Sequence, residues 1–213
     1  MSLNSSAIRG RFISLEGGEG VGKSTQVQAL ASALRSRGID VIVTREPGGS
    51  DGAERIRELL LTGTEDRWSA QAEALLFAAA RADHVAKTIR PALERGQWVV
   101  ADRFVDSSLA YQGGAGGLGI ETVRAVNAFG IEGDFPDRTL ILMLEEGAER
   151  ARSRDADGSD RIGGRSDEYH RKVEAAFHII AAEEPERVKL VDASGSAEQV
   201  TQRLFGAIQD LLP

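Results

Sequence analysis

The sequence contains no cysteine, which excludes disulfide bonds, thiolate nucleophiles and zinc–thiolate sites. Its three histidines, at positions 84, 170 and 178, match no metal-ligand spacing. Apolar runs such as Leu140–Leu144 fall far short of the ~18 residues that a membrane-spanning helix requires. The polar stretch 1–10 lacks the apolar centre of a secretory signal and is expected to be a flexible tail. We therefore predict a cytoplasmic protein that does not enter a membrane.

Positive charge is also scarce. The chain has 26 lysines and arginines against 33 aspartates and glutamates, which gives a formal net charge of −7. Proteins that bind nucleic acid usually present a basic surface, so nucleic-acid binding is not expected. The 213 residues, of which 41% are hydrophobic, suit one globular domain, which we place at 11–213.

Segments with strand and helix patterns alternate along the chain. Short apolar runs, several of them rich in β-branched residues, predict five strands, at 12–15, 41–44, 98–101, 138–144 and 188–191. Apolar residues at helical spacing predict helices at 24–37, 52–61, 69–94, 121–129, 168–182 and 197–212. Strands that alternate with helices form right-handed units around a parallel sheet. The predicted fold is therefore α/β, with a five-stranded parallel sheet covered by helices on both faces.

The predicted helix 69–94 has two unusual features. Residues 70–82 are apolar nearly all round, which indicates that they are covered on more than one side, within the core or at a subunit interface. Pro91 lies inside the helical pattern and is expected to kink or break it, because proline removes a backbone hydrogen bond.

The segment Gly17–Ser24 matches the phosphate-binding pattern G-x-x-x-x-G-K-[ST] between a predicted strand and a predicted helix. In such a P-loop, backbone N–H groups at the start of a helix point inward around phosphates. Lys23 would reach the β- and γ-phosphates of ATP, and the Ser24 hydroxyl would ligate Mg²⁺. The predicted ATP-binding residues are Gly17, Gly18, Glu19, Gly20, Val21, Gly22, Lys23, Ser24 and Thr25.

Other nucleotide-binding motifs do not fit this loop. A dinucleotide-binding loop needs G-x-G-x-x-G, but counting from Gly18 and Gly20 the last position is Lys23. A partition-type ATPase would carry a second lysine where this chain has Gly18, and no N-K-x-D guanine-reading motif occurs. Phosphotransferases and other ATPases remain.

Charged residues end two further predicted strands. Asp102 ends an apolar strand, where a carboxylate can organise Mg²⁺. Arg103 beside it and Arg45 at the end of the second strand lie at the carboxyl edge of the sheet, as the P-loop does. Two arginines at this edge indicate a second anionic group, such as the phosphate of an acceptor. The alternative is that either arginine pairs with a local acid on the surface.

These motifs are similar to those of the thymidylate kinase family. The resemblance rests on five segments in order, E-G-G-E-G-V-G-K-S-T at 16–25, T-R-E-P-G-G at 44–49, L-F-A-A-A-R at 76–81, D-R-F at 102–104 and S-S-L-A-Y-Q-G at 107–113. It implies the fold of P-loop nucleoside monophosphate kinases. It also implies direct in-line phosphoryl transfer from ATP to dTMP, with Mg²⁺, in a homodimer. The alternatives are another nucleoside or nucleotide kinase, or a partner-coupled P-loop ATPase without a small acceptor.

The resemblance implies roles on the acceptor side for residues at three strand ends. Glu19 would approach the 3′-hydroxyl of the deoxyribose. Arg45 and Arg103 would hold the dTMP phosphate. The resemblance further suggests a cis peptide at Glu46–Pro47, which the sequence alone does not establish.

The resemblance implies contacts to the base for residues of two later segments. Phe77 would stack on thymine, and Arg81, four residues later on the same helix face, would bond the base edge. Ser108 and Gln112 resemble further base contacts, and Tyr111 resembles the wall under C2′. The alternative for Phe77 is a place in the apolar core.

The arginine-rich segment at about 149–166 has no apolar face and resembles a lid. Arginines on a closing lid can stabilise the charge that develops during phosphoryl transfer. Because the P-loop has Gly20 where some family members carry an arginine, we expect the lid to supply it. The predicted catalytic residues are Lys23, Arg152, Arg154 and Arg161. The chain has Gly163 and Gly164 where relatives often carry an acid, and the alternative for the segment is a solvated loop of mixed charge.

Overall fold

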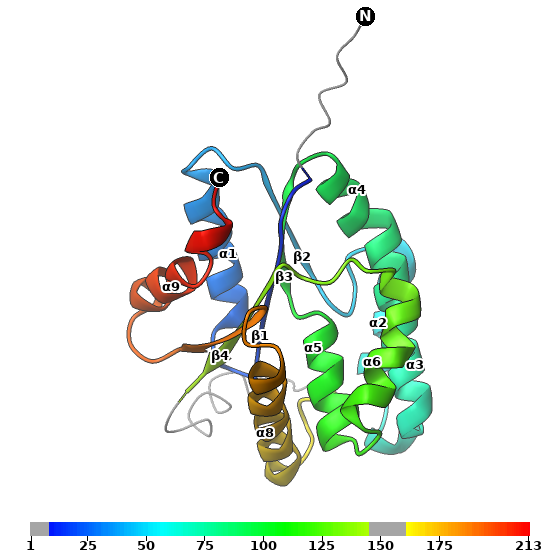
Figure 1. Cartoon of the computed structure of the whole chain (residues 1–213). Helices are drawn as coiled ribbons and strands as arrows, with labels where there is room; N and C mark the ends of the chain where they lie inside the picture. The colour runs from blue at the N-terminus through cyan, green and yellow to red at the C-terminus, as the bar shows by residue number, and fades with distance from the viewer. Residues whose placement is uncertain (1–8, 145–160) are drawn as a thin grey trace, which may run out of the picture.

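The protein, described here by a computed structural model over residues 9–144 and 161–213, is built around one five-stranded parallel sheet. The strand order is β2-β3-β1-β4-β5, which confirms the predicted α/β fold (Figure 1). The strands are β1 (Phe12–Gly17), β2 (Val41–Arg45), β3 (Trp98–Asp102), β4 (Arg138–Met143) and β5 (Val188–Asp192). Because β1 lies between β3 and β4, the loop that follows it opens at the middle of the carboxyl edge.

Helices cover both faces of the sheet. The helices are α1 (Lys23–Arg35), α2 (Asp51–Leu61), α3 (Ala70–His84), α4 (Arg90–Glu94), α5 (Val105–Ser108), α6 (Ile120–Ile131), α8 (Asp167–Glu183) and α9 (Ala197–Gly206). One face packs against α1 and α9, and the other against the layer that contains α4, α5 and α8 (Figure 1). Short 3₁₀ segments lie at Glu65–Arg67 and Gln209–Leu211.

The core divides into two clusters, one on each face of the sheet. Successive residues of a strand point to opposite faces. Phe12 accordingly packs edge-on against Phe104 in one cluster, while Ile13 joins Leu30 and Leu204 in the other. Every residue of β1 is buried, as expected for the central strand of a parallel sheet with helices on both faces. The strand therefore gives the P-loop a rigid base.

The predicted helix 69–94 is interrupted before Pro91 rather than at it. A π-helical turn, Val85–Ile89, separates α3 from α4, and Pro91 occupies the first turn of α4. Proline is tolerated there because N–H groups of a first turn need no helical partner. A second π-helical segment, Leu109–Ala115, occupies part of the region predicted as a glycine-rich loop. The second π-helical segment contains Tyr111 and Gln112, two residues that line the pocket described below.

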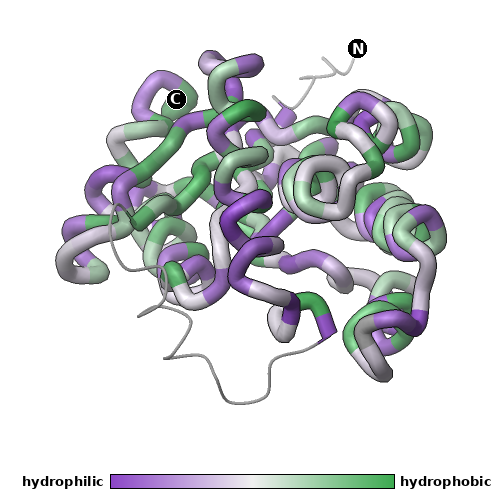
Figure 2. Tube along the Cα trace, turned by 90° about the horizontal axis from the view of Figure 1, so that it is seen from below, coloured by the Kyte–Doolittle hydropathy of each residue, from purple (hydrophilic) through white to green (hydrophobic). Residues whose placement is uncertain are grey.

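Most of two predicted segments lies outside the described residues. These are the tail at 1–10 and the lid at about 149–166, which includes Arg152 and Arg154. Seen from below, the foreground segment that continues from the grey trace into α8 is mostly hydrophilic (Figure 2). No helix in the described ranges is long and apolar enough to cross a membrane.

Candidate active site

The P-loop connects β1 directly to α1, as the sequence predicts. Gly20 and Gly22 have positive φ angles of 69° and 89°, which side chains rarely allow. The Nζ of Lys23 lies 2.5 Å from the carbonyl oxygen of Gly18 and donates to it. Burial, with a smaller effect of the Arg103 charge, lowers the pKa of Lys23 to about 7. An anionic phosphate in the loop would favour the charged ammonium group.

Ser24 and Asp102, predicted to bind the metal, are brought together across the carboxyl edge. The Ser24 hydroxyl donates to Oδ2 of Asp102 over 2.7 Å. No group of three or more histidines, aspartates and glutamates among the described residues could hold a metal ion. Mg²⁺ is usually held by one or two protein oxygens together with substrate phosphates and water. The pair of hard oxygen donors beside the P-loop therefore fits Mg²⁺ bound with a nucleotide.

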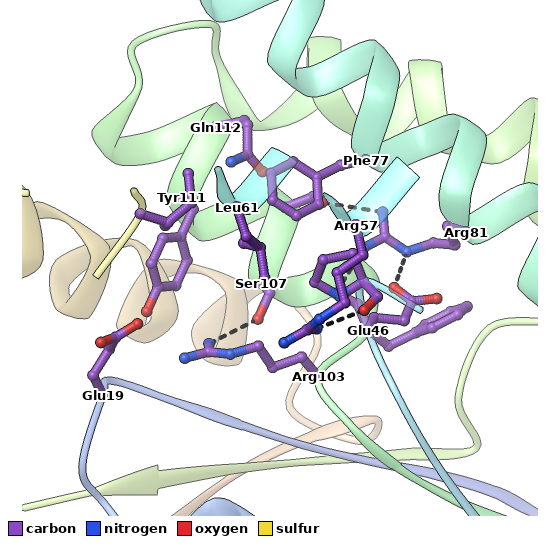
Figure 3. A pocket seen from close by; sticks show the side chains of 14 residues that line it. Glu19, Glu46, Arg57, Leu61, Phe77, Arg81, Arg103, Ser107, Tyr111 and Gln112 are labelled. Atoms are coloured by element: carbon purple, nitrogen blue, oxygen red, sulfur yellow. Dashed lines mark hydrogen bonds and ion pairs between the residues drawn. The ribbon is translucent and has the colours of Figure 1, made fainter. Parts of the chain in front are cut away.

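A pocket opens beside the P-loop, between the ends of β2 and β3 and the helices α2 and α3 (Figure 3). Its cavity volume is about 110 Å³, and it is partly open to solvent. Its lining residues are Glu19, Glu46, Pro47, Arg57, Leu61, Phe77, Arg81, Arg103, Phe104, Ser107, Ser108, Tyr111, Gln112 and Ile162. They include seven of the eight predicted acceptor-site residues, all except Arg45.

Arg81 is held rigidly at the inner end of this pocket. Its guanidinium donates to Glu46 over 2.7 Å, to Ser108 over 3.0 Å, to the Phe104 carbonyl over 3.1 Å and to Asn127. A guanidinium has five N–H groups, so these four bonds leave one N–H of Arg81 unused. Ser108, predicted as a base contact, here orients Arg81. The peptide Glu46–Pro47 is cis.

Arg103 is held at the outer end of the pocket, next to the P-loop. Its φ of 68° is unusual for a residue with a side chain. One guanidinium nitrogen donates to the Gly17 carbonyl over 3.1 Å and to the Ser107 hydroxyl over 3.2 Å (Figure 3). Ser107 in turn donates to the buried Glu16 over 2.5 Å. Burial, aided by the nearby Asp106, raises the pKa of Glu16 to about 8.

Two aromatic residues form walls of the pocket. The ring of Phe77 is half-buried on α3 and faces the open space, so it is not an ordinary core residue (Figure 3). Tyr111 lies with its ring 5.2 Å from the Arg103 guanidinium carbon. Its hydroxyl is buried without a hydrogen bond to the described part of the chain, and it turns toward Glu19 (Figure 3).

Arg45 lies elsewhere. Its side chain is 55% exposed and donates to both carboxylate oxygens of Glu54 over 3.1 Å. It lines a separate hollow with Ser24 and Asp102. The surface pairing with a local acid, the alternative given by the sequence, therefore describes Arg45 in this structure. The pocket instead contains Arg57 of α2, whose guanidinium donates to the Pro47 carbonyl over 2.6 Å.

Arg57 was missed because its sequence signal is only a charged residue in an amphipathic helix, a pattern that fits any exposed position. Its approach to the pocket depends on the sharp exit of β2 at Pro47, 10 residues before it in the sequence.

Arg161 is the one of the three predicted catalytic lid arginines that lies within the described residues, and it is buried. It donates to the Leu60 carbonyl over 2.9 Å and to Glu73 over 2.5 Å. A Cβ at Gly163 would approach Glu19 to 2.4 Å, so glycine allows this end of the lid to pack against the P-loop acid. A side chain at Gly163, such as the acid that relatives often carry there, would require the Glu19 carboxylate to move.

Comparison with known proteins identifies the family. The family model for thymidylate kinase matches residues 15–204. The chain is 61% identical over 206 residues to a thymidylate kinase of Rhizorhabdus wittichii (strain RW1), covering 96% of this chain and 99% of the relative. It is 47% identical over 207 residues to a thymidylate kinase of Bradyrhizobium sp. (strain ORS 278), covering 96% and 92%.

A solved structure agrees with these sequence matches. The thymidylate kinase of Ehrlichia chaffeensis superposes with a TM-score of 0.77 at 30% identity, covering 94% of this chain and 99% of that one. The matches span nearly the whole length and include the five motifs, and so the chain belongs to the thymidylate kinase family.

Proposed function

We propose that this chain transfers the γ-phosphoryl group of ATP to the phosphate of dTMP, giving dTDP and ADP. The observation that carries the proposal is the pocket directly beside the P-loop, which has two aromatic walls and contains the hydrogen-bonded guanidinium groups of Arg81 and Arg103. Such a pocket supplies a second nucleotide site within reach of the first, which a partner-coupled ATPase would not need.

On the donor side, Lys23 would bind the β- and γ-phosphates after leaving the Gly18 carbonyl. Ser24 and Asp102 would hold Mg²⁺, which when bound offsets negative charge on the phosphate oxygens. Arginines of the lid, with Arg152 and Arg154 as candidates, would stabilise the transferred group. Arg161 would have to leave Glu73 to join them, so we favour a role for it on the acceptor side.

On the acceptor side, Phe77 would stack on the thymine ring and Arg81 would donate to its edge. Arg103 and Arg57 would hold the phosphate, with Glu19 on the deoxyribose 3′-hydroxyl. Arg45 remains a second candidate for the phosphate if it leaves Glu54. Ser108 and Gln112 would complete the base contacts, and Tyr111 the wall under C2′.

The reaction then needs little chemistry from the protein itself. An acceptor phosphate oxygen would attack the γ-phosphorus in line with the departing β-phosphate oxygen, without a covalent enzyme intermediate. Positioning two bound nucleotides and neutralising their charge account for catalysis in such transfers. The rigid holding of Arg81 and Arg103 supports this mechanism, because preformed contacts do not reorganise during the reaction.

A homodimer is the second part of the proposal. Phe129 of α6 is 89% exposed and Leu75 of the neighbouring α3 is 58% exposed. The two helices touch closely, since a Cβ at Gly130 would lie 2.6 Å from that of Ala82. An apolar face of this kind is expected to be covered, and we infer that a second copy of the chain covers it. The cytoplasmic location stays a prediction.

A coupled ADP-release assay with ATP and Mg²⁺ tests the main proposal. The acceptors to compare are dTMP, dUMP, UMP, CMP, AMP, GMP and thymidine, and we expect strong preference for dTMP. Preference for another acceptor would favour a different nucleotide kinase. ADP release with ATP alone, not stimulated by any acceptor, would favour a partner-coupled ATPase.

A further inference from the structure

Glu73 of α3 is a buried acid whose carboxylate joins two parts of the molecule. It is 3% exposed. Its Oε2 accepts from Arg161 over 2.5 Å and from Arg165 over 2.7 Å. Its Oε1 accepts from Nε2 of Gln112 over 3.0 Å. The carboxylate is therefore asymmetric, with cations at one oxygen and a pocket residue at the other.

This arrangement fixes which way the Gln112 amide faces. A carboxylate paired with two guanidinium groups, as Glu73 is with Arg161 and Arg165, accepts hydrogen bonds and donates none. The side-chain amide of Gln112 can therefore bond to Glu73 only through its NH₂ group, which donates the hydrogen bond. The amide carbonyl then lies on the side away from Glu73, and Gln112 lines the same pocket as Phe77 (Figure 3).

We propose that Glu73 is a specificity-determining residue that orients Gln112 so that its carbonyl oxygen, not its NH₂ group, is offered to the pyrimidine base. The inference rests on the proposed function of the pocket as the dTMP site. Thymine and uracil carry an N3–H donor, which matches a carbonyl acceptor. Cytosine has an unprotonated N3, an acceptor that would face the carbonyl oxygen without a hydrogen. Glu73 thus selects for N3–H pyrimidines without touching them.

The substitution Glu73→Gln tests the proposal because the two arginines dictate its outcome. The carbonyl of the introduced amide will stay on Arg161 and Arg165, so its NH₂ group will face Gln112. Gln112 must then turn over and present its own NH₂ group to the pocket. We expect kcat/KM for dTMP to fall about tenfold to a hundredfold and kcat/KM for dCMP to rise, with Arg81 retaining part of the discrimination.

The opposite directions of the two changes separate this role from a structural one. Damage to the pocket would lower kcat/KM for both substrates by a similar factor. The matched control is Glu58→Gln on α2, the same chemical change at a side chain that is 69% exposed, which should alter neither. In a Gln112→Ala background, Glu73→Gln should no longer change the ratio of the two kcat/KM values.

Removing a buried charge could prevent folding, so a second variant is needed. Glu73→Gln combined with Arg165→Gln removes one cation together with the anion and leaves Arg161 to hold the introduced carbonyl. The same inversion of preference is expected there. An unchanged dTMP-to-dCMP ratio in whichever variant folds would overturn the proposal. If the unmodified protein does not phosphorylate dTMP, the proposed function fails instead.

Discussion

The proposed acceptor pocket and the neighbouring P-loop hold their charged side chains in different ways. In the pocket, Arg81 and Arg103 are already held by hydrogen bonds to the protein. At the P-loop, Lys23 donates to its own loop and Ser24 to Asp102. The arginines of the proposed acceptor side are thus held by bonds to other parts of the protein, whereas the P-loop groups form short bonds that phosphates and Mg²⁺ would have to replace.

This difference follows from what each side must recognise. A base is distinguished by the positions of a few donors and acceptors, so its readers must be rigid. A triphosphate carries high charge, which can displace weak internal bonds and pull cations into place. Substitutions in the proposed acceptor pocket should therefore change which acceptor is used, and substitutions in the P-loop should change the turnover rate.

The largest effect is expected for Lys23→Ala. Loss of the ammonium group that we propose to bind the transferred phosphate should lower kcat by about a hundredfold to a thousandfold, the cost typical of removing one preorganised charge-stabilising group. Thermal unfolding should change little. Lys172→Ala is the control, because that lysine is exposed and pairs with Glu168 one turn away in the helix α8. Near-normal turnover of Lys23→Ala would contradict the proposed role of Lys23 in binding the phosphates of ATP.

Arg103→Gln should have the next largest effect, on the acceptor side. A lost hydrogen-bonded charge contact to phosphate corresponds to about tenfold to a hundredfold in kcat/KM for dTMP. Arg45→Gln should cost less than tenfold, because Arg45 is exposed and paired with Glu54. Steady-state kinetics on both variants gives the comparison. A larger loss for Arg45 would mean that dTMP binding recruits it from the surface.

The sequence predicted the scaffold better than the pocket. The P-loop and the five strands were predicted because their patterns are local and regular. The π-helical turns at Val85–Ile89 and Leu109–Ala115 were missed, since each shifts helical register without a composition signal. Glu73 was missed because its partners Gln112 and Arg165 are 39 and 92 residues away in the sequence. Pairs of charged groups that lie far apart in the sequence produce no regular sequence pattern from which they could be predicted.

The pH dependence of nucleotide binding should report the internal bond of Lys23. With a pKa of about 7 in the free protein, Lys23 is about nine-tenths neutral at pH 8 and about nine-tenths charged at pH 6. Phosphate binding favours the charged form, so ADP binding should take up close to one proton at pH 8 and little at pH 6. Calorimetry in buffers of different ionisation enthalpy measures this uptake. Lys23→Met supplies the baseline, and equal uptake in both proteins would contradict the assignment.

The smallest kinetic effect is expected at the exposed apolar face. Phe129→Glu should convert the proposed dimer to monomer, because it places charge in a face that we expect to be buried. Light scattering at micromolar concentration measures the mass of the particle. We expect kcat to change less than it does with the substitutions described above. Glu121→Gln, on the same helix and 81% exposed, is the control. A monomeric unmodified protein would show that this face is free.

A crystal structure with dTMP and without ATP would test the central claim most directly. We expect the pyrimidine against Phe77, the phosphate at Arg103 and the bonds of Arg81 to Glu46 and Ser108 unchanged. A phosphate bound at Arg45 instead, or an Arg81 released from those partners, would contradict an acceptor pocket whose arginines are held in place by the protein itself.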